Sequence, residues 1–212
     1  MGRLYLIIFE RSNPNDLRGS LLTRMETMIM YFRGTKMNVL VYTLLPVVFM
    51  IHEFEEIIFL KYWINKDKDY LHNKFPKIGP KISSQYSKFS TSGFTLAIAE
   101  EFVIISILTY FAIVMKNVYI WFAVFMGYSV HIIIHIGQWI LYKKYIPVIV
   151  TSVLTLPYCI YGFMKIIDGE TFKIGPMIIC SIIGCIGVVL NLKFIHFLGH
   201  KFSKWENTLI SS

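Results

Sequence analysis

The chain has 212 residues, 55% of them hydrophobic and 16% aromatic, and its mean hydropathy is +0.57. This composition excludes an ordinary soluble domain and is typical of a polytopic membrane protein. The formal net charge is +8, but the basic residues are scattered through polar connections and form no stripe of the kind that binds nucleic acid. We therefore expect an all-α bundle of transmembrane helices and no nucleic-acid partner.

Residues 1–37 form an N-terminal extension. Within it, apolar residues recur at helical spacing over 17–28, with Arg18, Arg24 and Glu26 between them. This pattern predicts an amphipathic helix at the membrane interface, and a disordered leader is the alternative.

Five apolar runs follow the extension, and each is long enough to cross a bilayer, which takes about 20 residues. We expect spans at about 38–63, 94–115, 118–142, 145–167 and 172–197, within one transmembrane domain at 38–200 that is followed by a tail at 201–212. A lysine-rich polar loop is expected at 61–93. The three cysteines, Cys159, Cys180 and Cys185, lack CxxC spacing, which indicates buried free thiols. Low cysteine content and many Lys and Ile residues suit a bacterial cytoplasmic membrane.

The first span carries a cluster of ionisable residues, His52, Glu53, Glu55 and Glu56. A charged group at the centre of a membrane helix costs at least ~2.5–3.5 kcal/mol unless it is paired or binds something. At about 100° per residue, His52, Glu55 and Glu56 share one helix face, whereas Glu53 diverges and is set apart. This segment is therefore the first candidate for a functional site.

The second and third spans add further groups of the same type. Glu100 and Glu101 are adjacent in the second span, so we expect only one of them, Glu101, to face the site. In the third span, His131 and His135 are four residues apart, which puts both imidazoles on one helix face at a spacing suited to a shared metal ion.

Together these spans predict an intramembrane metal site. The expected ligands are His52, Glu55, Glu56, Glu101, His131 and His135. Mixed carboxylate and imidazole ligands suit a divalent metal, either iron, including a di-iron centre, or zinc. The catalytic candidates are Glu55, Glu56 and Glu101, of which one would act as general base in hydrolytic chemistry. A hydrogen-bonded packing network without metal is the structural alternative.

The motif His52-Glu53-Phe54-Glu55-Glu56 resembles the one for which the HXXEE-domain family of small bacterial membrane proteins is named. Leu44-Leu45-Pro46, the histidines of the third span and Tyr145-Ile146-Pro147 extend the resemblance over about 37–163. Members of that family are suspected metal-binding enzymes. The resemblance implies that His52, Glu55 and Glu56 are functional residues.

Membrane-embedded CAAX-type proteases offer a second comparison, because they combine an EExxxR motif with later intramembrane histidines. Here Leu60 follows Glu55-Glu56 where that motif has arginine, and Ile105 follows Glu100-Glu101. The missing arginine weakens the match.

We therefore expect a membrane-embedded metalloenzyme that acts on a membrane lipid or another apolar substrate. One alternative is a proton-coupled transporter, in which the same Glu and His residues would carry protons. The other is an accessory or immunity protein that binds a second membrane protein through a small-residue face such as that of the fifth span.

Overall fold

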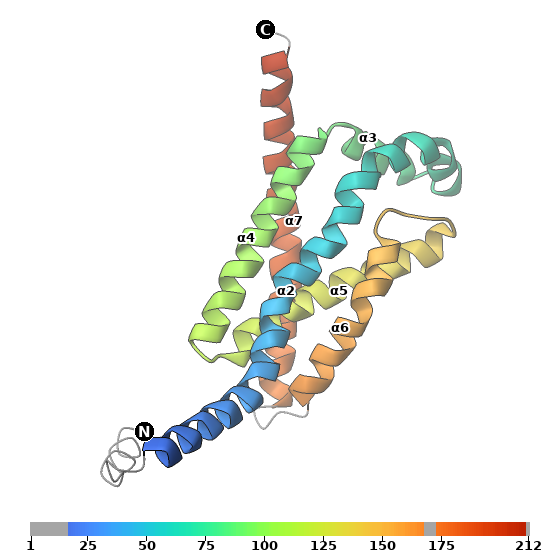
Figure 1. Cartoon of the computed structure of the whole chain (residues 1–212). Coiled ribbons are helices and arrows are strands. Elements are labelled where there is room, and N and C mark those ends of the chain that lie inside the picture. The colour runs from blue at the N-terminus through green and yellow to red at the C-terminus, as the bar shows by residue number, and fades with distance from the viewer. Residues whose placement is uncertain (1–16, 168–172, 211–212) are drawn as a thin grey trace. The chain divides into compact units, whose positions relative to one another are not determined.

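The structure is a computed structural model that describes residues 17–167 and 173–210, with side chains for 39–167 and 173–209; every regular element in this part is a helix (Figure 1). The helices are α2 (Leu17–Lys74), α3 (Gly79–Ser87), α4 (Thr91–Val114), α5 (Val118–Tyr142), α6 (Ile149–Ile167) and α7 (Ile174–Ile210). The chain divides into two compact units, Met1–Leu40 and Val41–Ser212. All residues of the candidate site belong to the second unit.

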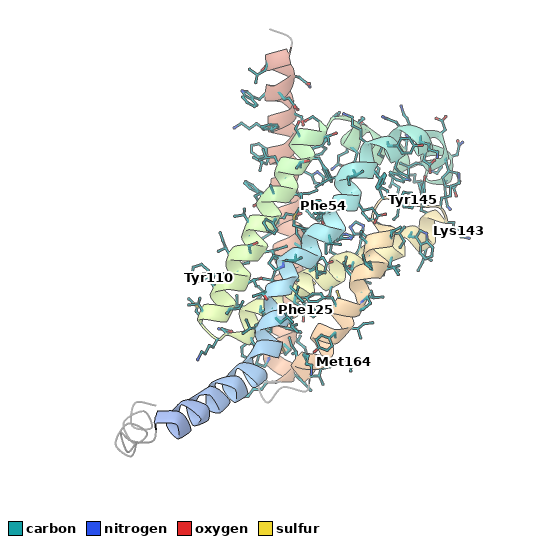
Figure 2. The ribbon with its side chains drawn as sticks, viewed as in Figure 1. Phe54, Tyr110, Phe125, Lys143, Tyr145 and Met164 are labelled. Carbon is teal, nitrogen blue, oxygen red and sulfur yellow. The ribbon has the colours of Figure 1, made fainter. Side chains whose placement is uncertain are left out.

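The expected all-α membrane bundle is confirmed. Four helices, α4 to α7, are long and apolar enough to cross a membrane, and they coincide with the second to fifth expected spans. The first expected span, 38–63, is helical as part of α2 but is not among those four, and it carries Glu53, Glu55 and Glu56. Apolar side chains such as Phe54, Tyr110 and Met164 are exposed on the outside of the second unit (Figure 2), as suits a surface that faces lipid.

Helix α2 begins at Leu17, within the expected N-terminal extension. The amphipathic pattern expected over 17–28 falls on helical backbone, but its side chains lie outside the described ones, as do residues 1–16 altogether. At the other end of the chain, α7 continues to Ile210 through most of the segment expected as a tail.

The expected polar loop at 61–93 was wrong in its extent, because most of it is helical. Helix α2 runs on to Lys74, and α3 occupies Gly79–Ser87. The extension of α2 is held by apolar packing, since Leu60, Ile64 and Leu71 are buried in one cluster with Tyr142 and Ile146. This part of α2 therefore packs against the α5–α6 connection.

Helix α5 is fixed at both ends. At its start, the side chain of Asn117 accepts hydrogen bonds from the backbone N–H groups of Tyr119 and Ile120. At its end, Lys143 adopts a left-handed conformation with φ of 63° and closes the last turn by donating to the carbonyl of Trp139. These caps define the helix that carries both histidines of the third span.

Helix α7 packs against α4 and α5, and a glycine permits its close approach to α5. A Cβ at Gly184 would clash with the carbonyl oxygen of Ala123, so this position has no room for a side chain. At Gly187, one turn further along α7, such a Cβ would have no atom within 4 Å among the described residues apart from its neighbours in the same helix. The small-residue face expected on the fifth span thus contacts α5 at Gly184 and leaves space beside α7 at Gly187.

Candidate metal centre between α2 and α5

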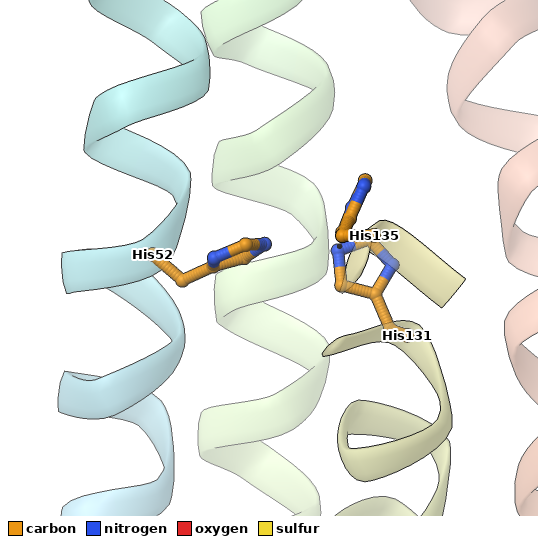
Figure 3. A group of neighbouring side chains, drawn as sticks. All are labelled: His52, His131 and His135. Carbon is orange, nitrogen blue, oxygen red and sulfur yellow. Dashed lines mark hydrogen bonds between the residues drawn. The ribbon is translucent and has the colours of Figure 1, made fainter. Parts of the chain in front are cut away.

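Three histidines converge between α2 and α5. Figure 3 shows His52 of α2 pointing toward His131 and His135, which stand one turn apart on α5. One nitrogen from each ring can be chosen so that all three atoms lie within 4.8 Å of one another. His131 Nε2 and His135 Nε2 are 2.9 Å apart. Two unprotonated nitrogens at that distance repel unless a proton or a cation lies between them.

The second nitrogen of His52 is held by Thr151 of α6. His52 Nδ1 lies 3.2 Å from Thr151 Oγ1, and that hydroxyl donates its own proton to Glu55 Oε2 at 2.6 Å. Because the contact with Glu55 is the shortest that this hydroxyl makes, we assign its proton there, so that the oxygen accepts from His52 Nδ1–H and the Nε2 lone pair is free. His52 is fully buried, and its Nε2 has no hydrogen-bond partner among the described residues. This is the orientation of a metal-ligating histidine.

His135 is oriented in the same way. Its Nδ1 lies 2.9 Å from Gln138 Oε1, an acceptor, so the ring donates from Nδ1 and presents an unprotonated Nε2 to His131. Gln138 follows His135 by three residues on the same helix, so this support is local to α5. Neither Gln138 nor Thr151 is among the residues expected at the site from the sequence.

Glu53 belongs to the cluster, although helix geometry alone had set it apart. Its Oε1 lies 3.6 Å from His131 Nε2. Glu53 is only 2% exposed, and Oε1 has no hydrogen-bond partner among the described residues. The divergence of about 100° between His52 and Glu53 on α2 therefore does not prevent both from reaching His131. A buried carboxylate oxygen of Glu53 therefore lies beside the group of imidazoles.

Glu55 is directed to the start of α6 and reaches His52 only through Thr151. Its carboxylate accepts from the backbone N–H groups of Thr151 at 2.8 Å and Val150 at 3.4 Å, and from the Tyr145 hydroxyl at 2.9 Å. A carboxylate is stabilised there by the positive end of the helix dipole. Partial burial and the adjacent carboxylate raise the pKa of the Tyr145 hydroxyl, which keeps it a donor. Glu55 therefore joins α2 to α6.

Glu56 and Glu101 lie toward α4 and α7. Glu56 is close enough to Glu53 and Glu101 for their carboxylates to interact electrostatically. Asn191 of α7 donates to Glu101 Oε1 at 3.2 Å and to Glu100 Oε2 at 3.3 Å. Both adjacent glutamates of α4 therefore share one amide. Asn191 was missed from the sequence, since nothing marks it within its apolar run.

A cavity of about 460 Å³ adjoins these groups and is lined by α2, α4, α5 and α7. Glu101, His131 and Asn191 contribute polar atoms to its wall. Most of the remaining lining is apolar, with Ile104, Ile105, Leu108, Val124, Ile183 and Val188 among its members. Pockets of this size and character are typical of small-molecule sites.

Residues 43–162, more than half of the chain, match a family described as "Protein of unknown function with HXXEE motif". This chain belongs to the HXXEE family. The match contains the three clustered histidines, all five glutamates discussed above and Thr151, but it ends before Asn191 in α7. The resemblance expected from the motif is confirmed. Comparisons with curated proteins and with solved structures gave no match.

The two glutamates that end the HXXEE motif are expected to differ in their effect on stability. Glu55→Gln should lower the free energy of unfolding by about 2 kcal/mol, because two backbone N–H groups at the start of α6 lose a charged acceptor. Glu56→Gln should leave stability unchanged or raise it, because it removes one of several neighbouring carboxylates. Thermal unfolding of both variants in detergent provides the measurement, and equal losses would contradict these positions.

Proposed function

We propose that this HXXEE protein is a metal-dependent enzyme of the bacterial cytoplasmic membrane that acts on a lipid or another apolar substrate. The observation that carries the proposal is the convergence of three imidazoles, two of them with Nδ1 engaged by an acceptor and Nε2 directed at the cluster. Such outer hydrogen bonds are the usual support of metal-ligating histidines.

The residues present fit a divalent cation. His52 Nε2 and Glu53 Oε1 are both buried without a hydrogen-bond partner in the described part of the chain, and a cation bound at the cluster would satisfy both. Zinc is often bound by three histidines, with a fourth coordination position left for water or substrate. Iron is also suited to a site in which imidazoles lie beside several carboxylates. His52, His131 and His135 would hold the ion, with Glu53 beside it. A second ion would draw its ligands from Glu53, Glu56 and Glu101.

The remaining residues of the site have distinct roles in this proposal. A bound metal ion supplies Lewis-acid chemistry and lowers the pKa of bound water. Glu101, at the wall of the cavity, is the candidate proton acceptor, and Asn191 holds its carboxylate toward the site. Glu55 and Thr151 are positioning residues, because they act on His52 without facing the cavity. The apolar lining excludes water and favours an apolar substrate.

The mutual proximity of one buried and two half-buried carboxylates favours a second candidate function. Glu53, Glu56 and Glu101 interact with one another, and Glu53 lies beside His131, so these groups form a chain from α5 through α2 to α4. Chains of Glu and His carry protons in many pumps and transporters. A proton-coupled transporter would retain this chain and need no metal, so proton flux by metal-free protein in liposomes would favour it over the enzyme.

The purified protein is expected to contain iron or zinc, and His52→Ala or His131→Ala should reduce the bound metal to background. Elemental mass spectrometry of detergent-solubilised samples is the measurement. His72→Ala is the matched control, because His72 is bonded to Ser83 at 2.6 Å, outside the cluster. Equal metal content in all four samples, or metal absent from the wild type, would contradict the metal centre.

Thr151→Val should weaken metal binding by about 10–100-fold while the protein still inserts and folds, because the substitution frees the His52 ring without removing a ligand. Thr151→Ser should restore the affinity, since it returns the hydroxyl. Ser152→Ala is the control, as the Ser152 hydroxyl donates to the backbone carbonyl of Val148 at 2.6 Å. Competition with a chromogenic chelator gives the affinities. Unchanged affinity in Thr151→Val would refute the relay from Glu55 to His52.

Cells that express the wild-type protein should show a change in membrane lipid composition that is absent with Glu101→Gln. The variant keeps the volume and the hydrogen bond to Asn191 but removes the proton-accepting carboxylate. Mass spectrometry of extracted lipids detects the change, and the metal content of the variant shows that the site is still formed. Identical lipid profiles would count against lipid as the substrate of the enzyme.

A further inference from the structure

A second recess lies on the surface of the bundle and shares no residue with the metal centre or its cavity. It has a volume of about 470 Å³ and is formed by α3, the residue that follows α3, and the last part of α7. We call it the basic recess, and its lining consists of Pro80, Lys81, Ser84, Gln85, Lys88 and His200.

The lining of the basic recess carries positive charge and no carboxylate. Lys81 and Lys88 are exposed, and neither forms an ion pair with a described residue. Lys88 and Lys204 are close enough to His200 for their charges to act on its ring electrostatically. Like charges gathered in this way repel one another unless an anion binds between them. The basic recess therefore has the electrostatic character of an anion site.

The walls of the basic recess are fixed by contacts between distant parts of the chain. The His200 ring stacks on the ring of Phe89, with 4.1 Å between their centres, and Phe89 is buried. A Cβ at Gly199 would clash with the Phe89 ring, so the glycine leaves room for this packing. Gln85 Nε2 lies 3.2 Å from His196 Nδ1, which joins α3 to α7. The polar groups of the recess are thus brought together by the fold.

The basic recess lies where the membrane spans end. Residues 174–192 of α7 contain no charged side chain and extend about 28 Å at 1.5 Å per residue, close to the thickness of the hydrocarbon layer. His200 follows this run, and Lys88 precedes the apolar helix α4. The hydroxyls of Ser90 and Ser203 lie 3.0 Å apart, which puts the start of α4 beside the last part of α7. The anions that a membrane presents at this level are lipid head groups.

Apolar side chains near the basic recess favour a lipid over a free anion. Ile78, directly before α3, is 52% exposed, and Phe197, three residues before His200 on α7, is 62% exposed. Exposed apolar groups of this kind suit contact with the acyl chains of a lipid, whereas a free phosphate would gain nothing from them.

We propose that the basic recess binds the head-group phosphate of an anionic phospholipid. Lys81 and Lys88 supply charge-assisted hydrogen bonds, and the Ser84 hydroxyl and an N–H of the His200 ring are further donors. A phosphate held by these groups joins α3 to α7, so the lipid stabilises the bundle. The site is separate from that of the proposed enzyme, and its lipid is not the substrate.

Native mass spectrometry of the purified full-length protein in detergent tests the site with two added lipids of identical acyl chains, phosphatidylglycerol and phosphatidylcholine. The wild type should bind one phosphatidylglycerol more tightly than phosphatidylcholine. The double variant Lys81→Gln/Lys88→Gln should weaken the binding of phosphatidylglycerol about tenfold or more, since each lysine near anionic lipid contributes about fivefold. Lys66→Gln/Lys68→Gln is the matched control, because it removes two exposed lysines of α2 that do not line the recess.

Two results would overturn the proposal directly: equal binding of the two lipids by the wild type, or equal weakening in the two double variants. Inorganic phosphate at the concentration of the lipid is the competing ligand, and it should leave phosphatidylglycerol bound. Displacement of the lipid by inorganic phosphate would identify a free phosphate as the ligand and overturn the assignment to lipid.

Thermal unfolding of the same samples provides a second measurement. Phosphatidylglycerol should raise the Tm of the wild type and of the control, and should leave the Tm of Lys81→Gln/Lys88→Gln unchanged. An equal rise in all three samples would contradict the site. Metal content should be the same in both double variants, because the recess contains none of the clustered histidines, so this test and that of the proposed enzyme can fail separately.

Discussion

Burial of ionisable groups within apolar helices is the constraint on which the site depends. Each such group costs at least ~2.5–3.5 kcal/mol at the centre of a membrane unless it is compensated. Glu55 is compensated by two N–H groups of α6, His52 Nδ1 by Thr151, and Glu101 by Asn191. Within the described residues, His52 Nε2 and Glu53 Oε1 are left unbonded, and both belong to the group around His131. A cation at that point would complete the compensation.

The spacing of the HXXEE motif has a structural reason in this arrangement. His52 and Glu55 lie nearly one turn apart on α2, so both can reach Thr151, one through its ring and the other through its carboxylate. Glu56 is rotated by a further 100° and faces the carboxylates of Glu53 and Glu101 instead. The first glutamate of the pair thus connects α2 to α6, and the second belongs to the acidic side of the site.

Helix content and the position of most spans could be predicted from the sequence, because long apolar runs have few alternatives in a membrane protein. The extent of α2 beyond Trp63 could not, because its polar residues gave no sign that Ile64 and Leu71 would find apolar partners in Tyr142 and Ile146. Tertiary packing, rather than local composition, determines that α2 continues to Lys74.

In the candidate site, too, relations within one helix could be predicted from the sequence, whereas contacts between helices could not. Helical spacing placed His131 and His135 on one face, since a single helix determines their relation. The contacts of Glu53 and Glu55 depend on how α2 meets α5 and α6, which periodicity within one helix does not reveal. Thr151 and Asn191 were missed because single polar residues in apolar runs usually bond to their own helix. Their contacts with glutamates on other helices are set by the packing of the bundle.

X-ray absorption spectroscopy of the purified protein, at the edge of the metal that it retains, tests the account most directly. We expect nitrogen and oxygen ligands only, with the multiple-scattering pattern of about three imidazoles. Sulfur ligation, or a coordination sphere without imidazole, would contradict it, because the metal would then be bound outside the cluster of His52, His131 and His135.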